Sequence, residues 1–360
     1  MRLKTAIIPL AIILVLILAL VGCTQPAPAP TPSPAPAPAP KPKYDPDPDM
    51  VTVSTTPMPA GKYMMMAGLV KIWHQNTRPT AVIGVGGGFT QLMTVVKGTA
   101  QYGTAMSPEV HWAYAGNDKI PDFQKLGPQP YLRKIMTISI APVHVVVMAN
   151  SPVKTLADMP KLQFPQAGTY SELNMLKGMA EAYGLKDVEY KQVAYGERYG
   201  AFKDRRQNHL TAISSLPGGG FVDIGSSLDV RFVSWDEGKL DAIVQKYPIF
   251  EKVVIPANMY PDQPEDVYAI AMAQDIVTYD TLNADLVYSQ VKTTLENTEA
   301  LVKLFKGWNF LDNQWAVRSH LTPYHEGAIR YYKEIGVWTT EHEKRQQDLL
   351  SGKSKFTSLD

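Results

Sequence analysis

The order of strand and helix patterns along the chain predicts an α/β fold made of two lobes. Residues 50–55 (MVTVST) alternate as a strand does, and from Gly61 the apolar residues recur at helical spacing. Residues 80–88 and 99–107 predict two more strands, with a second helical pattern between them that begins at Phe89. This order of strand, helix, strand, helix, strand favours a parallel sheet covered by helices.

The same pattern restarts further along the chain and predicts a second lobe. Residues 162–170 predict a strand that leads into a helix, and Thr169 and Glu172 have the spacing of a capping box at the start of that helix. Further strands are expected at 187–195, 210–220 and 230–236.

Long apolar segments connect the two predicted lobes. Residues 135–151 are expected to form a pair of apolar strands, and residues 250–260 and 267–279 form strands before a helical C-terminal region. The chain is therefore expected to leave lobe 1 and return to it, which places a cleft between two α/β domains joined by crossing hinge strands. The predicted boundaries are residues 50–145 with 260–345 for lobe 1, 146–259 for lobe 2 and 346–360 for a polar tail.

The N-terminus predicts export and attachment to a membrane. Residues 1–22 have the basic start and short apolar core of a signal peptide, and the core is shorter than the roughly 20 residues that a membrane-spanning helix needs. Small residues precede Cys23, as in bacterial lipoproteins, so Cys23 is expected to be lipidated; the alternative is a free thiol at the end of a membrane helix. Residues 23–49 are rich in proline and predict an extended tether.

The composition excludes several classes of protein. The net charge of +1 at pH 7 comes without a basic run, so nucleic acid is not an expected partner. Cys23 is the single cysteine, which rules out an intramolecular disulfide and a thiolate metal cluster.

Three predicted strand-to-helix turns have the position of ligand sites in α/β folds, at residues 57–65, 85–91 and 166–172. Glycines and free helix amides there favour an anionic ligand, although ordinary turns are the alternative reading. The candidate ligand-binding residues are Tyr63, Phe89, Thr90, Ser107, His144, Thr169, Tyr170, Ser171 and Ser215. For four of them a structural role is also open: a helix cap for Thr169, a core histidine for His144, and turn formation for Ser107 and Ser215.

Several segments resemble a known family. Residues 255–271 (IPANMYPDQPEDVYAIA) and 323–338 (PYHEGAIRYYKEIGVW) are similar to two segments of the TAXI family, the solute receptors of one branch of TRAP (tripartite ATP-independent periplasmic) transporters. Shorter similarities at residues 61–63, 86–103 and 141–159 extend the resemblance, in order, over residues 50–338.

The resemblance implies a type II periplasmic-binding-protein fold, no cofactor, and a TRAP permease as partner. It also implies an extracytoplasmic receptor without catalytic activity for glutamate-like or other small carboxylates. Two segments depart from the family, 167–172, where bulky Tyr170 is inserted, and 209–220, so a specific ligand does not follow. An ABC importer or a sensor with the same fold is the alternative.

Enzyme signatures are missing from the sequence. His325 and Glu326 do not continue into a zinc-protease motif, because residue 329 is isoleucine, and no metal site is expected. His325 and Glu326 are instead expected at a junction that leads into a closing helix. No G-x-S-x-G or nucleotide-binding loop occurs, and the acidic residues considered for sugar cleavage are expected in solvated loops: Asp223, Asp229, Asp236 and Glu237.

Overall fold

The computed structural model describes residues 45–56, 61–85, 89–117, 119–158, 164–166, 170–186, 190–192 and 195–353. The predicted signal peptide, Cys23, most of the predicted tether and Thr169 lie outside these residues, and so does the side chain of Tyr170.

A mixed sheet with the order β2-β1-β3-β10-β4-β7 forms the centre of the described structure, with β8 paired to β4 and β9 paired to β10. Its strands are β1 (Met50–Thr55), β2 (Thr80–Val85), β3 (Tyr102–Met106), β4 (Leu132–Met148), β7 (His209–Ile213), β8 (Val230–Phe232), β9 (Glu251–Ile255) and β10 (Val267–Tyr279). A separate parallel pair consists of β5 (Phe164–Gln166) and β6 (Tyr190–Gln192).

The predicted parallel sheet of lobe 1 is confirmed. Strand β1 pairs in parallel with β2 and with β3, and Ser54 lies opposite Gly103 in the register. Gly103 allows helix α3 (Thr90–Val96) to lie close to β3, because a Cβ atom there would be 2.6 Å from the carbonyl oxygen of Gln91. Since β1 and β3 are parallel, their carboxyl ends lie at the same edge of the sheet.

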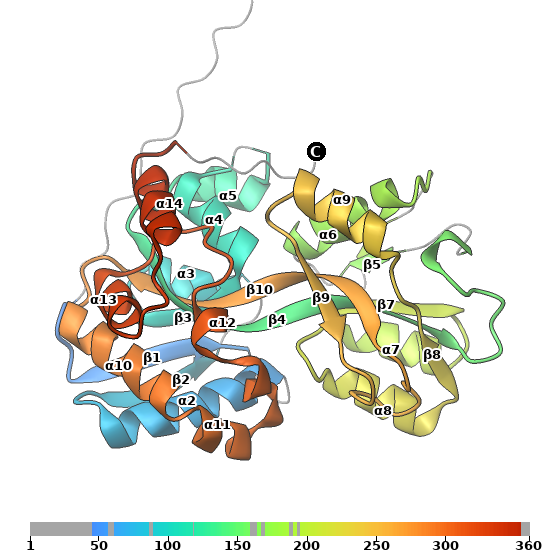
Figure 1. The fold of residues 1–360 in the computed structure, drawn as a ribbon, viewed down its shortest axis with the longest axis horizontal. Helices are drawn as coiled ribbons and strands as arrows, with labels where there is room; N and C mark the ends of the chain where they lie inside the picture. Colours follow the sequence, from blue (N-terminus) through green and yellow to red (C-terminus); the bar gives the residue numbers. More distant parts are fainter. Residues whose placement is uncertain are drawn as a thin grey trace, which may run out of the picture. The chain divides into compact units, whose positions relative to one another are not determined.

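Two long strands connect the lobes, as predicted, but residues 135–151 do not form a strand pair. Residues 135–148 belong to the single strand β4, which has 17 residues and pairs first with β10 and then, from Val143 to Val147, with β7. Pro142, which lacks an N–H group, falls where β4 changes partner, so it interrupts neither run of strand pairing. In Figure 1, β4 and β10 run side by side from the helices on the left to those on the right. The predicted two-lobed type II fold with crossing strands is confirmed.

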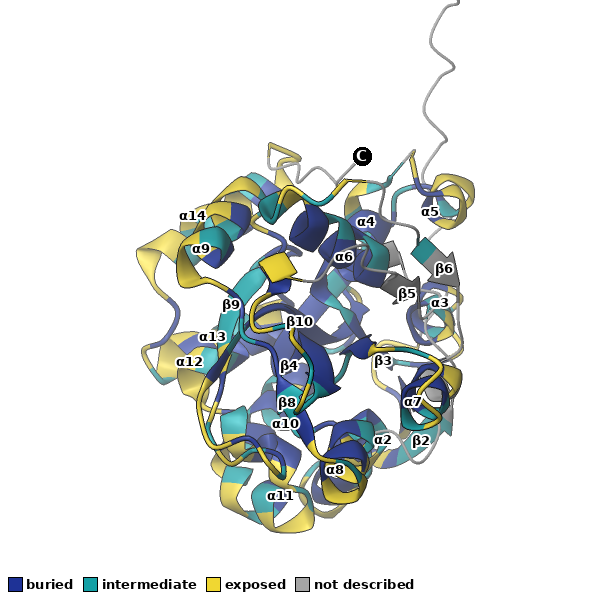
Figure 2. Ribbon diagram, turned by 90° about the vertical axis from the view of Figure 1, so that its right-hand side faces the viewer, coloured by how far each residue is buried: buried dark blue, intermediate teal, exposed yellow. Residues whose placement is uncertain are grey.

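Helices cover the sheet, and their outward faces are exposed while the central strands β4 and β10 are mostly buried (Figure 2). Lobe 1 carries α2 (Gly61–Asn76), α3, α4 (Ser107–Ala115), α5 (Pro121–Leu126), α10 (Ala284–Glu296), α11 (Thr298–Leu304), α12 (Asn313–Ala316), α13 (Glu326–Glu334) and α14 (Thr340–Leu350). Lobe 2 carries α6 (Tyr170–Ala182), α7 (Tyr195–Lys203), α8 (Gly219–Ser227) and α9 (Glu237–Lys246), and short 3-10 turns lie at Leu156–Asp158 and Lys306–Phe310.

The chain returns to lobe 1 along β10. Tyr260 still packs in lobe 2, where its ring stacks on Phe232 with centroids 4.9 Å apart, and only Gln274–Val277 pair with β3. Helix α14 continues to Leu350, with Leu349 buried, so the first part of the predicted polar tail is helical.

The segment that contains His325 forms the predicted junction and closing helix. His325 is the N-cap of α13, and its Nδ1 atom accepts a hydrogen bond of 3.2 Å from the amide of Gly327. A Cβ atom on Gly327 would lie 2.2 Å from the carbonyl oxygen of Ala284, so the glycine permits close packing of α13 on α10. The hydroxyl of Tyr332 donates to the carbonyl of Ile135 at 2.6 Å, which fixes α13 on the sheet.

Candidate functional site

The carboxyl end of β1 carries three buried hydroxyl groups. Ser54 and Thr55 are 1% and 0% exposed, and the hydroxyl oxygen of Thr56 in the following residue is also buried. None of the three side-chain oxygens has a hydrogen-bond partner in the described part of the chain. A buried hydroxyl without a partner costs about 1–3 kcal/mol, so a ligand that supplies hydrogen bonds here would remove an existing penalty.

Two ionisable side chains are buried near this edge. Lys62 in the first turn of α2 is 9% exposed, and Glu109 in the first turn of α4 is 6% exposed. Burial lowers the pKa of Lys62 to about 8, and the negative charge of Glu109 partly opposes that change. Burial also raises the pKa of Glu109, against the opposing effects of Ser171 and Lys62.

A hydrogen bond between Ser171 and Glu109 joins the two lobes at this place. The hydroxyl of Ser171, in α6 of lobe 2, donates to Oε1 of Glu109, in α4 of lobe 1, at 2.7 Å. Glu172, the expected second half of the capping box, is paired with Nη1 of Arg198 at 2.8 Å, and its expected partner Thr169 lies outside the described residues. We name Ser54, Thr55, Thr56, Lys62, Glu109 and Ser171 the interlobe cluster.

Sequence reasoning included Ser171 in the site but missed Lys62 and Glu109. The available signal was a lysine and a glutamate at the starts of otherwise apolar helices that follow parallel strands. A charged residue at a helix start indicates a binding site only when the fold buries it, and burial cannot be read from the sequence.

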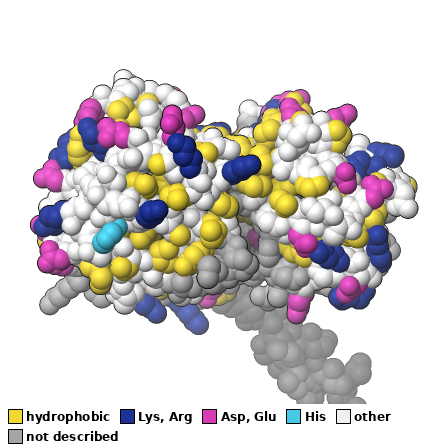
Figure 3. Space-filling model, turned by 90° about the horizontal axis from the view of Figure 1, so that it is seen from below, with side chains coloured by type: hydrophobic (Ala, Val, Ile, Leu, Met, Phe, Trp, Pro, Cys, Tyr) yellow, Lys and Arg dark blue, Asp and Glu magenta, His cyan; other side chains and the backbone are white. Residues whose placement is uncertain are grey.

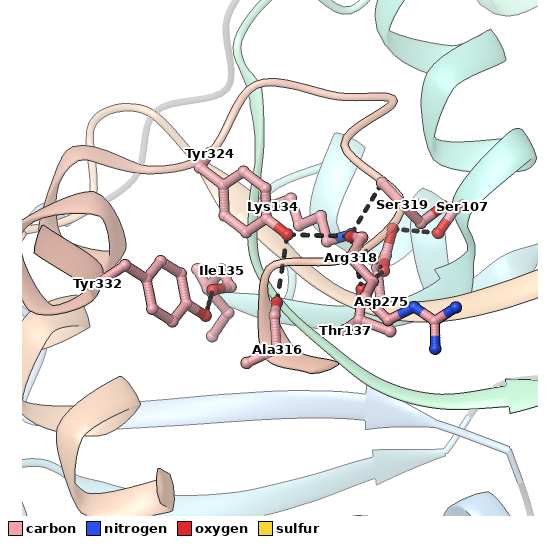
Figure 4. Close-up of polar contacts among 10 residues, drawn as sticks. All are labelled: Ser107, Lys134, Ile135, Thr137, Asp275, Ala316, Arg318, Ser319, Tyr324 and Tyr332. Atoms are coloured by element: carbon pink, nitrogen blue, oxygen red, sulfur yellow. Dashed lines mark hydrogen bonds and ion pairs between the residues drawn. The ribbon is translucent and has the colours of Figure 1, made fainter. Parts of the chain in front are cut away.

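Ser107 belongs to a different, fully bonded cluster that fixes the crossing strands to the C-terminal region (Figure 4). Its hydroxyl donates to Oδ2 of Asp275 at 2.5 Å, and Thr137 donates to Oδ1 at 3.0 Å. The ammonium of Lys134 lies 2.9 Å from Oδ1 of the same carboxylate. That ammonium also donates to the carbonyls of Arg318 and Ser319, at 2.6 Å and 3.0 Å.

His144 has the environment of a core histidine, which was the alternative reading of this residue. Its Nε2 atom lies 2.8 Å from the hydroxyl of Tyr260, its Nδ1 atom lies 3.1 Å from the carbonyl of Pro142, and its ring stacks on Phe221. Burial lowers the pKa of His144 to about 3, so the ring is neutral at pH 7.

The remaining candidates are dispersed. Phe89 packs edge-on against Phe123 with ring centroids 4.9 Å apart, and Thr90 is exposed at the start of α3. Tyr63 is half-buried on α2. Ser215 donates to Oε1 of Gln274 on β10 at 3.2 Å. Ligand contact by these residues remains a prediction.

The largest surface groove among the described residues has a mixed charge and is a less suitable site for an anionic ligand than the interlobe cluster. A groove of about 610 Å³ lies between β9, residues 317–321 and α14, but it combines both charge signs: Arg318, Lys344, Arg345, Glu251, Glu341 and Asp348. The face in Figure 3 likewise carries acidic and basic side chains interspersed. All four acidic residues considered for sugar cleavage are exposed, as expected, but only Asp229 and Asp236 lie in loops, since Asp223 belongs to α8 and Glu237 begins α9.

The described residues contain neither a helix that could span a membrane nor a cluster of side chains that could bind a metal ion. No helix among them is long and apolar enough to cross a membrane. No group of three or more histidine, cysteine, aspartate or glutamate side chains among them could hold a metal ion.

Solved structures with a similar fold are remote in sequence. The periplasmic aliphatic sulphonate binding protein SsuA from Escherichia coli is 14% identical, with 87% of this chain and 94% of that chain covered and a TM-score of 0.44. The probable amino-acid ABC transporter extracellular-binding protein ytmK from Bacillus subtilis is 12% identical, with 72% and 97% covered and a TM-score of 0.45. A putative L-cystine ABC transporter from Listeria monocytogenes is 12% identical, with 72% and 95% covered and a TM-score of 0.43.

The sequence itself identifies the family. The profile of the NMT1-like family matches residues 53–336, which include both lobes and the crossing strands. This protein therefore belongs to the NMT1-like family.

Proposed function

We infer that the protein is an extracytoplasmic solute receptor, without catalytic activity, that binds a small organic acid or amino acid between its lobes. The observation that carries this proposal is the interlobe cluster, in which three buried hydroxyls lack partners in the described chain beside a buried lysine and glutamate. A cluster of this kind suits a polar ligand that supplies the missing hydrogen bonds.

The position of the cluster supports capture by lobe closure. The bond from Ser171 to Glu109 joins helices of different lobes, and the lobes are connected through β4 and β10. A ligand held by residues of both lobes binds the closed form better than the open form, so it shifts the population towards closure. The closed receptor then presents its ligand to a membrane transporter.

A TRAP permease is the partner that the resemblance to the TAXI family favours. The predicted lipid at Cys23 and the proline-rich tether, which lie outside the described residues, would keep the receptor at the membrane and near its permease. An ABC importer or a sensor is the second candidate. The source of energy separates them, because uptake through a TRAP permease stops when the ion gradient collapses and uptake through an ABC importer stops when ATP is depleted.

A thermal-shift screen of the purified chain against monocarboxylates, dicarboxylates, 2-oxoacids and amino acids tests the receptor function. A ligand that binds only the folded state raises stability by about 2.7 kcal/mol at one hundred times its dissociation constant. We expect one chemical class to give a saturable shift.

Two matched variants locate the binding site. Thr55→Val removes a buried hydroxyl while keeping the side-chain shape, so it should weaken the shift without destabilising the ligand-free protein. Thr80→Val, at an exposed position on β2, should keep the full shift. The absence of a shift with every acid, or an unchanged shift in Thr55→Val, contradicts the proposed site.

A further inference from the structure

Lys62 is a buried cation whose ammonium has no hydrogen-bond partner among the residues that the structure describes. It is 9% exposed, and it makes no ion pair with any of those residues either. A buried ammonium without hydrogen bonds is unfavourable unless an opposite charge approaches it. Its three donors are therefore available to a ligand in the interlobe cluster.

Glu109 contributes a carboxyl group to the same cluster. It acts on Lys62 electrostatically without forming an ion pair, and its Oε1 atom is occupied by the hydroxyl of Ser171. Glu172 of α6 also acts on Glu109, but its own carboxylate is paired with Arg198. The charges that face an incoming ligand are thus one free ammonium and one carboxylate that is already held in place.

We propose that Lys62 binds the acidic group of the solute and that Glu109 limits the solute to a single negative charge. This inference rests on the proposed function and narrows its ligand to a monoanion, such as a monocarboxylate. A dianion would place three negative charges around one ammonium, and like charges repel more strongly in a buried site than in water. Hydroxyl groups of the interlobe cluster then bind neutral polar groups of the same solute.

The test compares solutes that differ only at one end. Isothermal titration calorimetry of the purified chain gives dissociation constants for butyrate (a monoanion), succinate (a dianion) and 4-aminobutyrate (a zwitterion). Longer and aromatic acids, matched in the same way, form further series. The monoanion should bind most tightly in each series in which binding occurs. Tighter binding of the dianion overturns the proposed role of Glu109, and tighter binding of the zwitterion makes Glu109 an ammonium site instead.

Variants assign the effect to the two residues. Lys62→Gln should weaken monoanion binding by about tenfold or more, because a charge-assisted hydrogen bond is lost. Lys71→Gln, at an exposed position on the same helix, should bind as the original chain does. Glu109→Gln should improve succinate binding relative to butyrate.

The outcomes separate this inference from the receptor function. Unchanged monoanion affinity in Lys62→Gln, with the ligand still bound, overturns the inference and leaves the receptor function standing. If none of the acids binds the original chain, the receptor function for acids fails and the inference fails with it. The ligand-free unfolding midpoint gives an independent readout: a lysine needed only for structure predicts a lower midpoint in Lys62→Gln, whereas a ligand-binding lysine predicts an equal or higher one.

Discussion

Two buried lysines in this protein, each near a carboxyl group, differ in their hydrogen bonding. Lys134 makes three polar contacts and Asp275 accepts from two hydroxyls besides, so this pair is fully bonded within the fold. Lys62 interacts with Glu109 only through space. The difference teaches that burial of a charge does not by itself identify a binding site. What distinguishes the interlobe cluster is the bonding capacity that the chain does not use.

The location of each arrangement agrees with this division. Lys134 and Asp275 lie on the two crossing strands, where they fix residues 318 and 319 to the sheet (Figure 4). Lys62 and Glu109 lie at helix starts after parallel strands, which is where α/β folds bind ligands. The first arrangement fixes parts of the fold to one another, and the second is the one that we propose for ligand recognition.

The largest expected effect comes from breaking the complete pair. Lys134→Met leaves the carboxylate of Asp275 buried without its cation, so we expect a loss of about 3–5 kcal/mol in the free energy of unfolding. Urea denaturation measures it. The double variant Lys134→Met with Asp275→Asn should recover part of the loss, and a single variant as stable as the original would show that the pair contributes nothing.

The same substitution at Lys62 should have a different, pH-dependent effect. The pKa of Lys62 is about 8 in the folded chain, against 10.5 for an ordinary lysine, so the unfolded chain binds more protons between these two pH values. The contribution of Lys62 to the free energy of unfolding therefore rises by on the order of 3 kcal/mol as the pH increases from 8 to 10.5. The variant Lys62→Met should lack this rise. Below pH 8 the variant should be as stable as the original or more stable.

Unfolding curves for the original chain, Lys62→Met and Lys71→Met over this pH range test the difference. Lys71→Met is the control, because Lys71 is exposed on the same helix. Parallel pH profiles for the original chain and Lys62→Met would mean that Lys62 titrates normally in the fold.

The smallest effect is expected at an exposed ion pair. Lys252 lies 3.0 Å from Oε2 of Glu237 and 2.9 Å from Oδ1 of Asp241, and both carboxylates are more than half exposed. Lys252→Ala should lower the free energy of unfolding far less than Lys134→Met does, since water screens such pairs. A loss as large as that of Lys134→Met would show that burial does not separate the two classes.

Local sequence patterns determined most of the secondary structure and the order of the chain through its lobes. Alternation predicted β1 and helical spacing predicted α2, because each depends on residues that are close in the sequence. The same reasoning split residues 135–151 into two strands. Only the change of partner from β10 to β7 explains why one strand continues through Pro142.

The tertiary structure alone decided which polar residues belong together. Ser171 and Glu109 are 62 positions apart, and Ser107 and Asp275 are 168 apart, so no local spacing could indicate that one serine joins the lobes and the other serves a structural carboxylate. Lys62 was not among the candidates from the sequence, and only the fold shows that it is buried. The physical reason is that burial and hydrogen-bond satisfaction are properties of the assembled sheet and lobes, whereas periodicity is a property of the segment.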